Sequence, residues 1–493
     1  MSIISVLFLF LFLPLALTVY YIADDKAKEY VLLVISLFFY ALGCVNFIVP
    51  FIAAVVVTVL HGRLISLTPK RVIKKIFLVT GIVFNTGLLF YFKYFNFTLE
   101  IVGRLASKEA PSVKKILLPW GISFYSFKAI SYLIDVYSGK AVLDENPVHD
   151  ALYLSIFTQI QSGPISRYNE MHGNPAKIRM ESAVSTQGGK QYKYKQFSKQ
   201  SSILFSDGVY RFLIGFNKKV LIANVLANIT SEIFGTPIEN LSTSYAWLGS
   251  VCYSLQLFFD FAGYSDMAIG LTEMFGYKCR ENFDYPYMTE SVAKFWRRWH
   301  ISLGDWFRDY IYIPMGGSRD SQKWKVYFNL LVVWILTGIW HGAAWNFVLW
   351  GLGYFVLISF ERLTGLPEKI ASRTAQILYR IPVLLFINFQ WVLFNSDGIV
   401  RGLRYIKRMI LFYPNTLSDQ RTRFLIKDYS FFIIMAVVLC FPVIPWIEKK
   451  LSVNESAAKI YNASICIVTT AAFLWAVSFV VAGQNNPFAY ANF

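Results

Sequence analysis

Residues 326–359, VYFNLLVVWILTGIWHGAAWNFVLWGLGYFVLIS, form a continuous apolar run without Asp, Glu, Lys or Arg. A membrane helix needs about 20 apolar residues, so this run is long enough for a bent pair of helices. Mostly apolar runs recur at residues 1–22, 29–49, 50–62, 76–97, 116–137, 151–165, 204–227, 244–272, 378–396, 430–447 and 463–483. They lack the two-residue alternation of outer-membrane strands. We therefore predict an all-α polytopic membrane protein with about 10–13 transmembrane or re-entrant helices.

The composition of the 493-residue chain supports the same class of protein. Hydrophobic residues make up 56% of the chain and charged residues only 16%, whereas soluble domains average about 25% charged residues. The chain carries 47 Lys and Arg against 30 Asp and Glu, a net charge of +17. Because these basic residues are scattered between apolar runs, we assign them to cytoplasmic loops and membrane lipid and not to nucleic acid.

We expect a single integral membrane domain over residues 1–493. It comprises N-terminal helices (1–115), a core (116–360) with a polar or re-entrant block (276–325), and C-terminal helices (361–493). Residues 1–22 lack a basic n-region, so we interpret them as a retained first transmembrane helix. The five cysteines are far apart and form no CxxC pair, so we expect neither a disulfide framework nor a metal site.

Two basic segments, 63–75 and 167–200, predict the orientation of the chain. Because cytoplasmic loops are enriched in Lys and Arg, we expect both segments to lie in the cytoplasm. Two full spans at 116–137 and 151–165 would place the segments on opposite sides of the membrane. We therefore expect that one of these two runs does not cross.

The block 276–325 is unusual because it is rich in charged and aromatic residues yet lies between apolar helices. It has nine Lys and Arg against six Asp and Glu. Tyr285-Pro286, Pro314 and Gly316-Gly317 should break it into short helical pieces. The block is consistent with a polar cavity inside the membrane; the alternative is a cytoplasmic loop with aromatic interface anchors.

The central part of this block predicts one helix with an aromatic face. Its face residues are spaced i, i+4, i+7 and i+11: Phe295, Trp299, Ser302 and Trp306. The charged residues lie around the rest of that helix: Arg297, Arg298, Asp305, Arg308 and Asp309. Such a helix suits the wall of a polar cavity.

His341 is the candidate catalytic residue, because it is the only ionisable residue in VVWILTGIWHGAAWNFVLWG (332–351). An ionisable side chain inside a membrane segment is costly and indicates function. Gly338 and Gly342 form a small-xxx-small pair that lets another backbone approach. A neutral imidazole there could accept a hydroxyl proton. The alternative is a structural histidine hydrogen-bonded to a neighbouring helix.

His300 is the natural second member of this site, with a cavity-lining or headgroup histidine as the alternative. His61, His149 and His172 lie in or beside polar connections, and we expect them to face solvent or lipid headgroups. Two acids in apolar surroundings, Asp260 and Asp266, are expected to form structural pairs, and orienting an imidazole is the second possibility.

These motifs also carry a family resemblance. FWRRWHISLGDWFRDYIYIPMGG (295–317) and LTGIWHGAAWNFVLWGLGY (336–354) resemble the membrane-bound O-acyltransferase (MBOAT) superfamily, and within it the alginate O-acetylation, AlgI-like, branch. Further matching blocks follow in family order over most of the chain: LPWGISFYSFKAISYLIDVYSG (118–139), SGPISRY (162–168), FFDFAGYSDMAIG (258–270) and NPFAYANF (486–493). One departure is Gln161, where relatives usually carry a more apolar residue.

The resemblance places the family's catalytic histidine on His341 and its second signature histidine on His300. It implies transfer of an acyl group, usually acetyl, from cytoplasmic acetyl-CoA to a hydroxyl through a helical funnel. It also implies a bacterial inner-membrane location, an exported polysaccharide acceptor such as alginate, peptidoglycan or cellulose, and a separate extracytoplasmic SGNH-type acetyltransferase.

Our hypothesis is that His341 acts as general base and that His300 orients or stabilises the reacting groups. Acetyl-CoA is then a substrate, and no bound cofactor is expected. Arginines suit the donor's phosphates because guanidinium groups match phosphate oxygens; interface anchoring or ion pairs are the alternative for them. The candidate substrate-binding residues are Arg297, Arg298, Trp299, Asp305, Arg308, Trp340, Trp345 and Asn346.

Three other functions remain open. D-alanyl transfer to teichoic acid belongs to the same superfamily. A transporter or flippase of acyl or glycan carriers should show inverted repeats, and none is visible in the sequence. A scaffold for a polysaccharide synthase would need no buried histidine pair.

Overall fold

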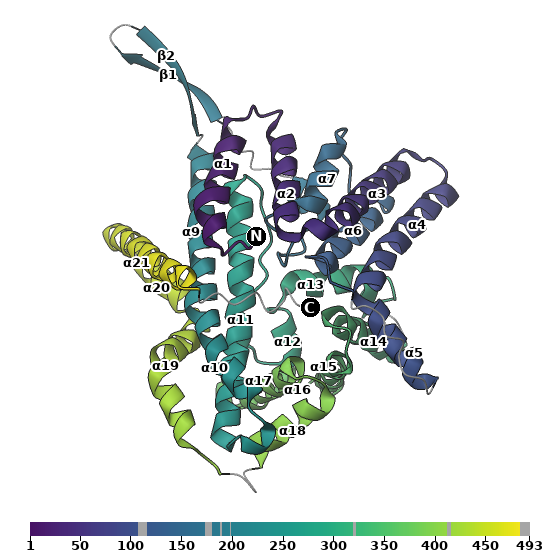
Figure 1. Cartoon of the computed structure of the whole chain (residues 1–493), viewed down its shortest axis with the longest axis vertical. Helices are drawn as coiled ribbons and strands as arrows, with labels where there is room; N and C mark the ends of the chain where they lie inside the picture. Colours follow the sequence, from purple (N-terminus) through teal and green to yellow (C-terminus); the bar gives the residue numbers. More distant parts are fainter. Residues whose placement is uncertain are drawn as a thin grey trace.

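The computed structural model describes residues 1–106, 116–172, 180–187, 190–197, 199–318, 322–411 and 416–483. Its body is a bundle of helices, which confirms the predicted all-α membrane fold (Figure 1). The described residues add one antiparallel hairpin of β1 (Met180–Gln187) and β2 (Lys190–Phe197). The hairpin lies within the basic segment 167–200 and projects above α9 at the top of Figure 1.

The N-terminal helices extend from α1, beside α9, to α3 and α4 on the right of Figure 1. The apolar helix Phe8–Ile22 is shorter than the spanning length expected for residues 1–22. Tyr20 fixes it to the core by donating a hydrogen bond to the Phe275 carbonyl over 2.7 Å. The elements are η1 (Phe8–Phe12), α1 (Leu13–Ile22), α2 (Lys28–Cys44), η2 (Val45–Phe47), α3 (Ile48–Leu67), α4 (Arg71–Leu89), η3 (Phe90–Tyr94) and α5 (Phe95–Leu105).

The long helix α11 runs through the middle of the bundle beside α9 (Figure 1). Glycines let the two backbones meet: a Cβ on Gly215 would lie 2.5 Å from the Gly263 carbonyl oxygen, and one on Gly270 would lie 2.4 Å from that of Gly208. The elements here are α6 (Ile122–Tyr137), α7 (Pro147–Ser155), α8 (Tyr168–His172), α9 (Lys199–Asn217), η4 (Lys218–Ala223), α10 (Asn224–Gly235), η5 (Ile238–Asn240) and α11 (Thr243–Met274).

Helix α7, in the second of the two doubtful runs, is short. It has nine residues, about 13 Å at 1.5 Å per residue, which is less than half of a hydrocarbon core. The chain then continues through residues 156–167 as buried turns and irregular structure. The run 151–165 therefore contains no helix long enough to span a membrane.

The block 276–325 breaks into short pieces near the predicted positions: η6 (Pro286–Met288), α12 (Val292–Trp296), α13 (Ile301–Phe307) and η7 (Arg308–Tyr312). The prediction of one continuous aromatic helix was wrong. His300 has a left-handed backbone with φ of 47°. Extended backbone pairing replaces the helix there: Ile301 donates to the Asn282 carbonyl and Asp284 to the Arg298 carbonyl, both over 3.0 Å.

The run 326–359 forms the predicted bent pair, α14 (Lys323–His341) and α15 (Trp345–Thr364). The close approach predicted from Gly338 and Gly342 is confirmed. A Cβ on Gly338 would lie 2.4 Å from the Phe347 carbonyl oxygen, and one on Gly342 would lie 2.1 Å from the Phe347 ring. The pair therefore packs backbone against backbone, and His341 ends the first helix.

The remaining helices complete the bundle: α16 (Leu366–Lys369), α17 (Arg373–Asn395), α18 (Ile399–Ile410), α19 (Gln420–Leu439), α20 (Val443–Leu451) and α21 (Glu455–Val481). Among the described residues, six helices or helix runs are long and apolar enough to cross a membrane. The pair α19–α20, bent by 62°, raises this number to seven if it is one span. The protein is thus a multi-pass membrane protein with additional shorter helices.

Candidate active site

The structure brings the two candidate histidines together around one indole ring. His300 and His341 are each 1% exposed. The ring centroid of Trp340 lies 5.9 Å from that of His300 and 5.0 Å from that of His341. Residues 41 positions apart in the sequence therefore form one buried cluster.

His341 lies at the C-terminal end of α14 in an aromatic environment. Its ring packs against Trp350 and Phe394, with centroids 4.9 Å and 5.2 Å away. Burial among such groups favours the neutral imidazole, because charge is costly to remove from water. The environment of His341 therefore suits a base that carries a lone pair at neutral pH.

His300 lies between α12 and α13, at the point where the left-handed residue interrupts the helix. Its Nδ1 is 3.2 Å from Oδ1 of Asn282. Phe261 packs edge-on against the ring at 4.5 Å, and Phe124 stacks on it at 6.3 Å. The imidazole is thus held by a polar contact to Asn282 and by aromatic packing.

Lys93 is a member of this site that the sequence analysis missed. Its Nζ donates hydrogen bonds to the Trp340 carbonyl and, over 3.0 Å, to Ser123 Oγ. The adjacent Tyr94 hydroxyl donates to the Ile339 carbonyl, also over 3.0 Å. These carbonyls lie at the C-terminal end of α14. The last carbonyls of a helix have no partner within the helix, and a nearby cation stabilises that end. As the only charged residue in the run 76–97, Lys93 gave a signal that could have found it.

A cavity of about 450 Å³ lies beside His300. Three of the predicted substrate-binding residues line it: Arg297, Asp305 and Arg308. The other lining residues are mainly apolar: Ala293, Trp296, Ile301, Leu303, Gly304, Phe307, Val333, Trp334 and Thr337. A cavity lined by both charged and apolar residues could accept a ligand that has a charged and an apolar part.

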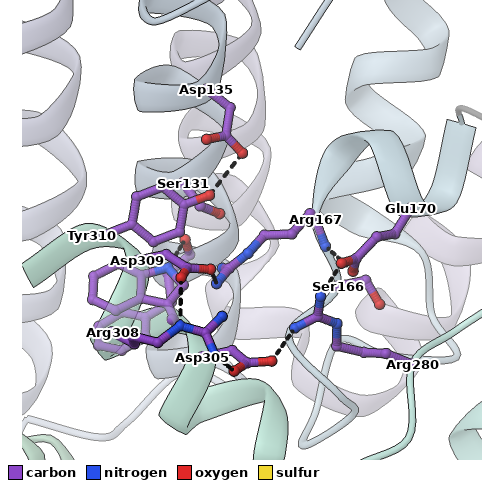
Figure 2. Close-up of polar contacts among 12 residues, drawn as sticks. Ser131, Asp135, Ser166, Arg167, Glu170, Arg280, Asp305, Arg308, Asp309 and Tyr310 are labelled. Carbon is purple, nitrogen blue, oxygen red and sulfur yellow. Dashed lines mark hydrogen bonds and ion pairs between the residues drawn. The ribbon is translucent and has the colours of Figure 1, made fainter. Parts of the chain in front are cut away.

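An ion-pair network joins four separate chain segments next to this cavity (Figure 2). Arg280 binds Glu170, and its Nη1 is 2.8 Å from Asp305. Arg308 binds Asp305 over 2.6 Å and Asp309 over 2.8 Å. The other contacts are Arg167 to Asp309 over 3.4 Å and the Tyr310 hydroxyl to Asp135 over 2.7 Å.

The network affects how Arg308 can be used. Hydrogen bonding to Asp309, with the nearby Asp305 carboxylate, raises the pKa of the Arg308 guanidinium against the effect of burial. Arg308 therefore stays charged, but that charge is already engaged by the protein's own carboxylates. A phosphate would have to compete for it.

Five predicted substrate-binding residues do not line the cavity, and one of them, Trp340, packs instead against the two histidines. Trp299 is fully buried and packs against Trp391, with ring centroids 4.9 Å apart. Arg298 lies 3.8 Å from Asp284. Trp345 is half exposed, and Asn346 donates to the carbonyls of Leu393 and Ser396.

The remaining polar residues from the sequence analysis have structural surroundings. The expected pairing of the two acids is confirmed: Asp260 binds Lys219, and Asp266 binds Arg211 over 2.6 Å and Lys218 over 2.7 Å. His149 is 2.6 Å from Glu29, and His61 Nδ1 is 2.8 Å from the Val57 carbonyl. The side chain of His172 lies outside the described residues, and Gln161 is buried.

Comparisons with known proteins identify the family of this chain. Residues 146–398 match the family model of the membrane-bound O-acyltransferase family. The chain is 37% identical to the probable alginate O-acetylase AlgI of Azotobacter vinelandii, over 84% of this chain and 79% of the relative. It is 35% identical to the Pseudomonas aeruginosa protein of that name, over 84% and 76%. A peptidoglycan O-acetyltransferase of Helicobacter pylori is 29% identical over 99% of this chain and 96% of the relative. With its buried histidine pair inside the matched region, the chain belongs to the membrane-bound O-acyltransferase family and is an O-acyltransferase.

Proposed function

We propose that the protein moves an acetyl group from cytoplasmic acetyl-CoA across the membrane, for O-acetylation of an exported or cell-wall polysaccharide. The observation that carries the proposal is the gathering of His341 and His300 around Trp340, next to a cavity with basic residues on its wall. The names of the relatives, alginate O-acetylases and a peptidoglycan O-acetyltransferase, support a polysaccharide as the acceptor.

The proposed reaction is a direct acyl transfer. A neutral His341 accepts the proton of the acceptor hydroxyl while the hydroxyl oxygen attacks the thioester carbonyl carbon. The carbon–sulfur bond breaks, the new ester forms, and the leaving thiolate takes the proton from the imidazolium. General base catalysis of this kind contributes roughly 10²–10⁴-fold. The aromatic packing around the imidazole keeps out water, which would otherwise hydrolyse the thioester.

The donor would enter at the cavity beside His300. Arg297 is exposed and forms no ion pair with any residue that the structure describes, so it is the side chain best placed to dock the phosphates of coenzyme A. Arg308 is a second candidate, but the phosphate must first displace the carboxylates of Asp305 and Asp309 from its guanidinium group. The apolar residues that line the cavity suit the pantetheine arm.

The acceptor would approach from another side of His341. Phe394 packs against His341, and the three residues that follow it, Asn395, Ser396 and Asp397, line a polar cavity of about 410 Å³. Amide, hydroxyl and carboxylate groups are typical partners for sugar hydroxyls. We propose that this side is extracytoplasmic and that a separate SGNH-type acetyltransferase or the glycan itself receives the acetyl group there. The basic segments 63–75 and 167–200 support an inner-membrane orientation with both of them in the cytoplasm.

The test uses purified protein in lipid nanodiscs with acetyl-labelled acetyl-CoA and oligosaccharide acceptors. We expect labelled product from the wild type and none from His341→Ala, although the variant still inserts and accumulates. Trp345→Ala is the matched control, because Trp345 is half exposed and lies outside the histidine cluster. Full acetylation by His341→Ala would overturn the mechanism. Transfer from a D-alanyl thioester but not from acetyl-CoA would overturn the choice of donor.

A further inference from the structure

Asn282, in the chain that follows α11, contacts the ring of His300, and the proposed reaction does not yet use this residue. The residue is buried at 1% exposure. Its Oδ1 lies 3.2 Å from His300 Nδ1, 3.2 Å from the backbone nitrogen of Ser302 and 2.9 Å from Ser302 Oγ. Its Nδ2 donates over 3.1 Å to Ser265 Oγ on α11. The amide therefore links the central helix to the segment that carries the histidine.

The identity of the amide atoms follows from these contacts. A backbone N–H can only donate, so the end of the amide that faces Ser302 must be the oxygen. An amide oxygen can only accept. The nitrogen of His300 that faces the same oxygen must therefore carry a proton.

We infer that Asn282 is a positioning residue that fixes His300 as the Nδ1–H tautomer. This inference rests on the proposed function for its catalytic meaning, but the tautomer itself follows from the geometry. In a neutral imidazole only one nitrogen carries a proton, so Nε2 then carries the lone pair. His300 thus acts as a hydrogen-bond acceptor through Nε2 and cannot stabilise an oxyanion as a neutral donor there.

The backbone around Asn282 keeps this contact in place. The Asn282 carbonyl accepts a hydrogen bond from Ile301, and Phe283 pairs with Trp299 in an antiparallel bridge. His300 lies between these two pairs with a φ of 47°, a conformation that costs a non-glycine residue about 1–3 kcal/mol. Paired backbone on both sides of His300 holds this conformation and keeps Nδ1 opposite the amide oxygen.

The direct test is the tautomer of His300 in the full-length protein. Protein labelled with ¹⁵N in its histidine side chains is placed in nanodiscs, and His300→Gln identifies the His300 signals by their loss. We expect a protonated Nδ1 and a lone-pair Nε2 in the wild type. An Nε2–H tautomer in the wild type would overturn the inference, whatever the activity of the enzyme.

Variants of Asn282 add the functional readout. Asn282→Asp keeps the acceptor oxygen and should keep the Nδ1–H tautomer. Asn282→Leu removes it and should give the Nε2–H form or a mixture, with kcat lower on the order of 10–100-fold and a nearly unchanged KM. Asn388→Leu is the matched control, because Asn388 is a buried amide whose Nδ2 donates to the Ser250 carbonyl and Ser254 Oγ. It should leave the His300 signals unchanged.

The outcomes separate this inference from the proposed function. An unchanged His300 tautomer in a folded Asn282→Leu protein would overturn the positioning role. If Asn282→Leu does not fold, the wild-type spectrum still decides the tautomer. Loss of the Nδ1–H form in Asn282→Leu, together with no acetyl transfer from acetyl-CoA by the wild type, would support the positioning and refute the proposed function.

Discussion

The tight contact between α14 and α15 allows a quantitative prediction for Gly338→Ala. The added Cβ would lie 2.4 Å from the Phe347 carbonyl oxygen and 3.4 Å from Val348 Cα, both backbone atoms of α15. Ordinary contact begins at 3.4 Å, so the two helices must separate by about 1 Å. His341 lies one turn further along the same helix. A misplacement of about 1 Å costs on the order of 10²-fold in rate, and overpacking of this kind costs about 1–3 kcal/mol of stability.

The assay compares kcat for acetyl transfer and the thermal unfolding of detergent-solubilised Gly338→Ala and wild-type protein. Gly87→Ala is the matched control, since Gly87 is also helical and a Cβ there meets no atom within 4 Å. It should be neutral or stabilising by about 0.4–1 kcal/mol. Wild-type kcat and melting temperature in Gly338→Ala would refute the claim that backbone contact sets the position of His341.

Three further changes test other parts of the site. Lys93→Met should lower the free energy of unfolding by about 1.5–3 kcal/mol, because it removes a charged donor from the end of α14. It should also lower kcat, and a wild-type kcat in a folded variant would argue against a role of Lys93 in the site. Arg297→Gln should raise the KM for acetyl-CoA about tenfold at constant kcat, and Arg298→Gln, outside the cavity, should not; equal KM values would exclude docking at Arg297. Asp260→Asn should cost about 3–5 kcal/mol in unfolding free energy because it leaves the buried Lys219 cation uncompensated, and the doubly apolar pair Asp260→Leu with Lys219→Leu should recover most of it. Equal stability of the single and double variants would contradict that account.

Much of the fold was accessible from the sequence because membrane helices are recognised by length and apolarity. Local patterns alone predict the bent pair at 326–359 and its glycine contact. They also predict that the two buried acids, Asp260 and Asp266, each form an ion pair with a basic residue. The run 151–165 was harder. Its residues are as apolar as those of a span, and only the structure shows that its helix, α7, is too short to span.

The parts of the site that escaped prediction depend on contacts between distant segments. Periodicity predicted one helix through Phe295 and Trp306, but pairing with residues 282–284 breaks it at His300. Asn282 could not be predicted as a site residue either, because nothing near it in the sequence shows that it contacts the imidazole of His300. Trp345 and Asn346 were chosen for their closeness to His341 in sequence, yet they point to other partners.

The hydrogen bond from Lys93 to the Trp340 carbonyl bears on how this family can be divided and recombined. Lys93 lies outside residues 146–398, the part that the family model covers. A chimaera that grafts only the matched region onto another protein's N-terminal helices would therefore inherit both histidines but lose the cation at the end of their helix. A segment exchanged between such enzymes should therefore include the first 106 residues. Chimaeras that include them should retain turnover, whereas chimaeras that carry only the matched region should not.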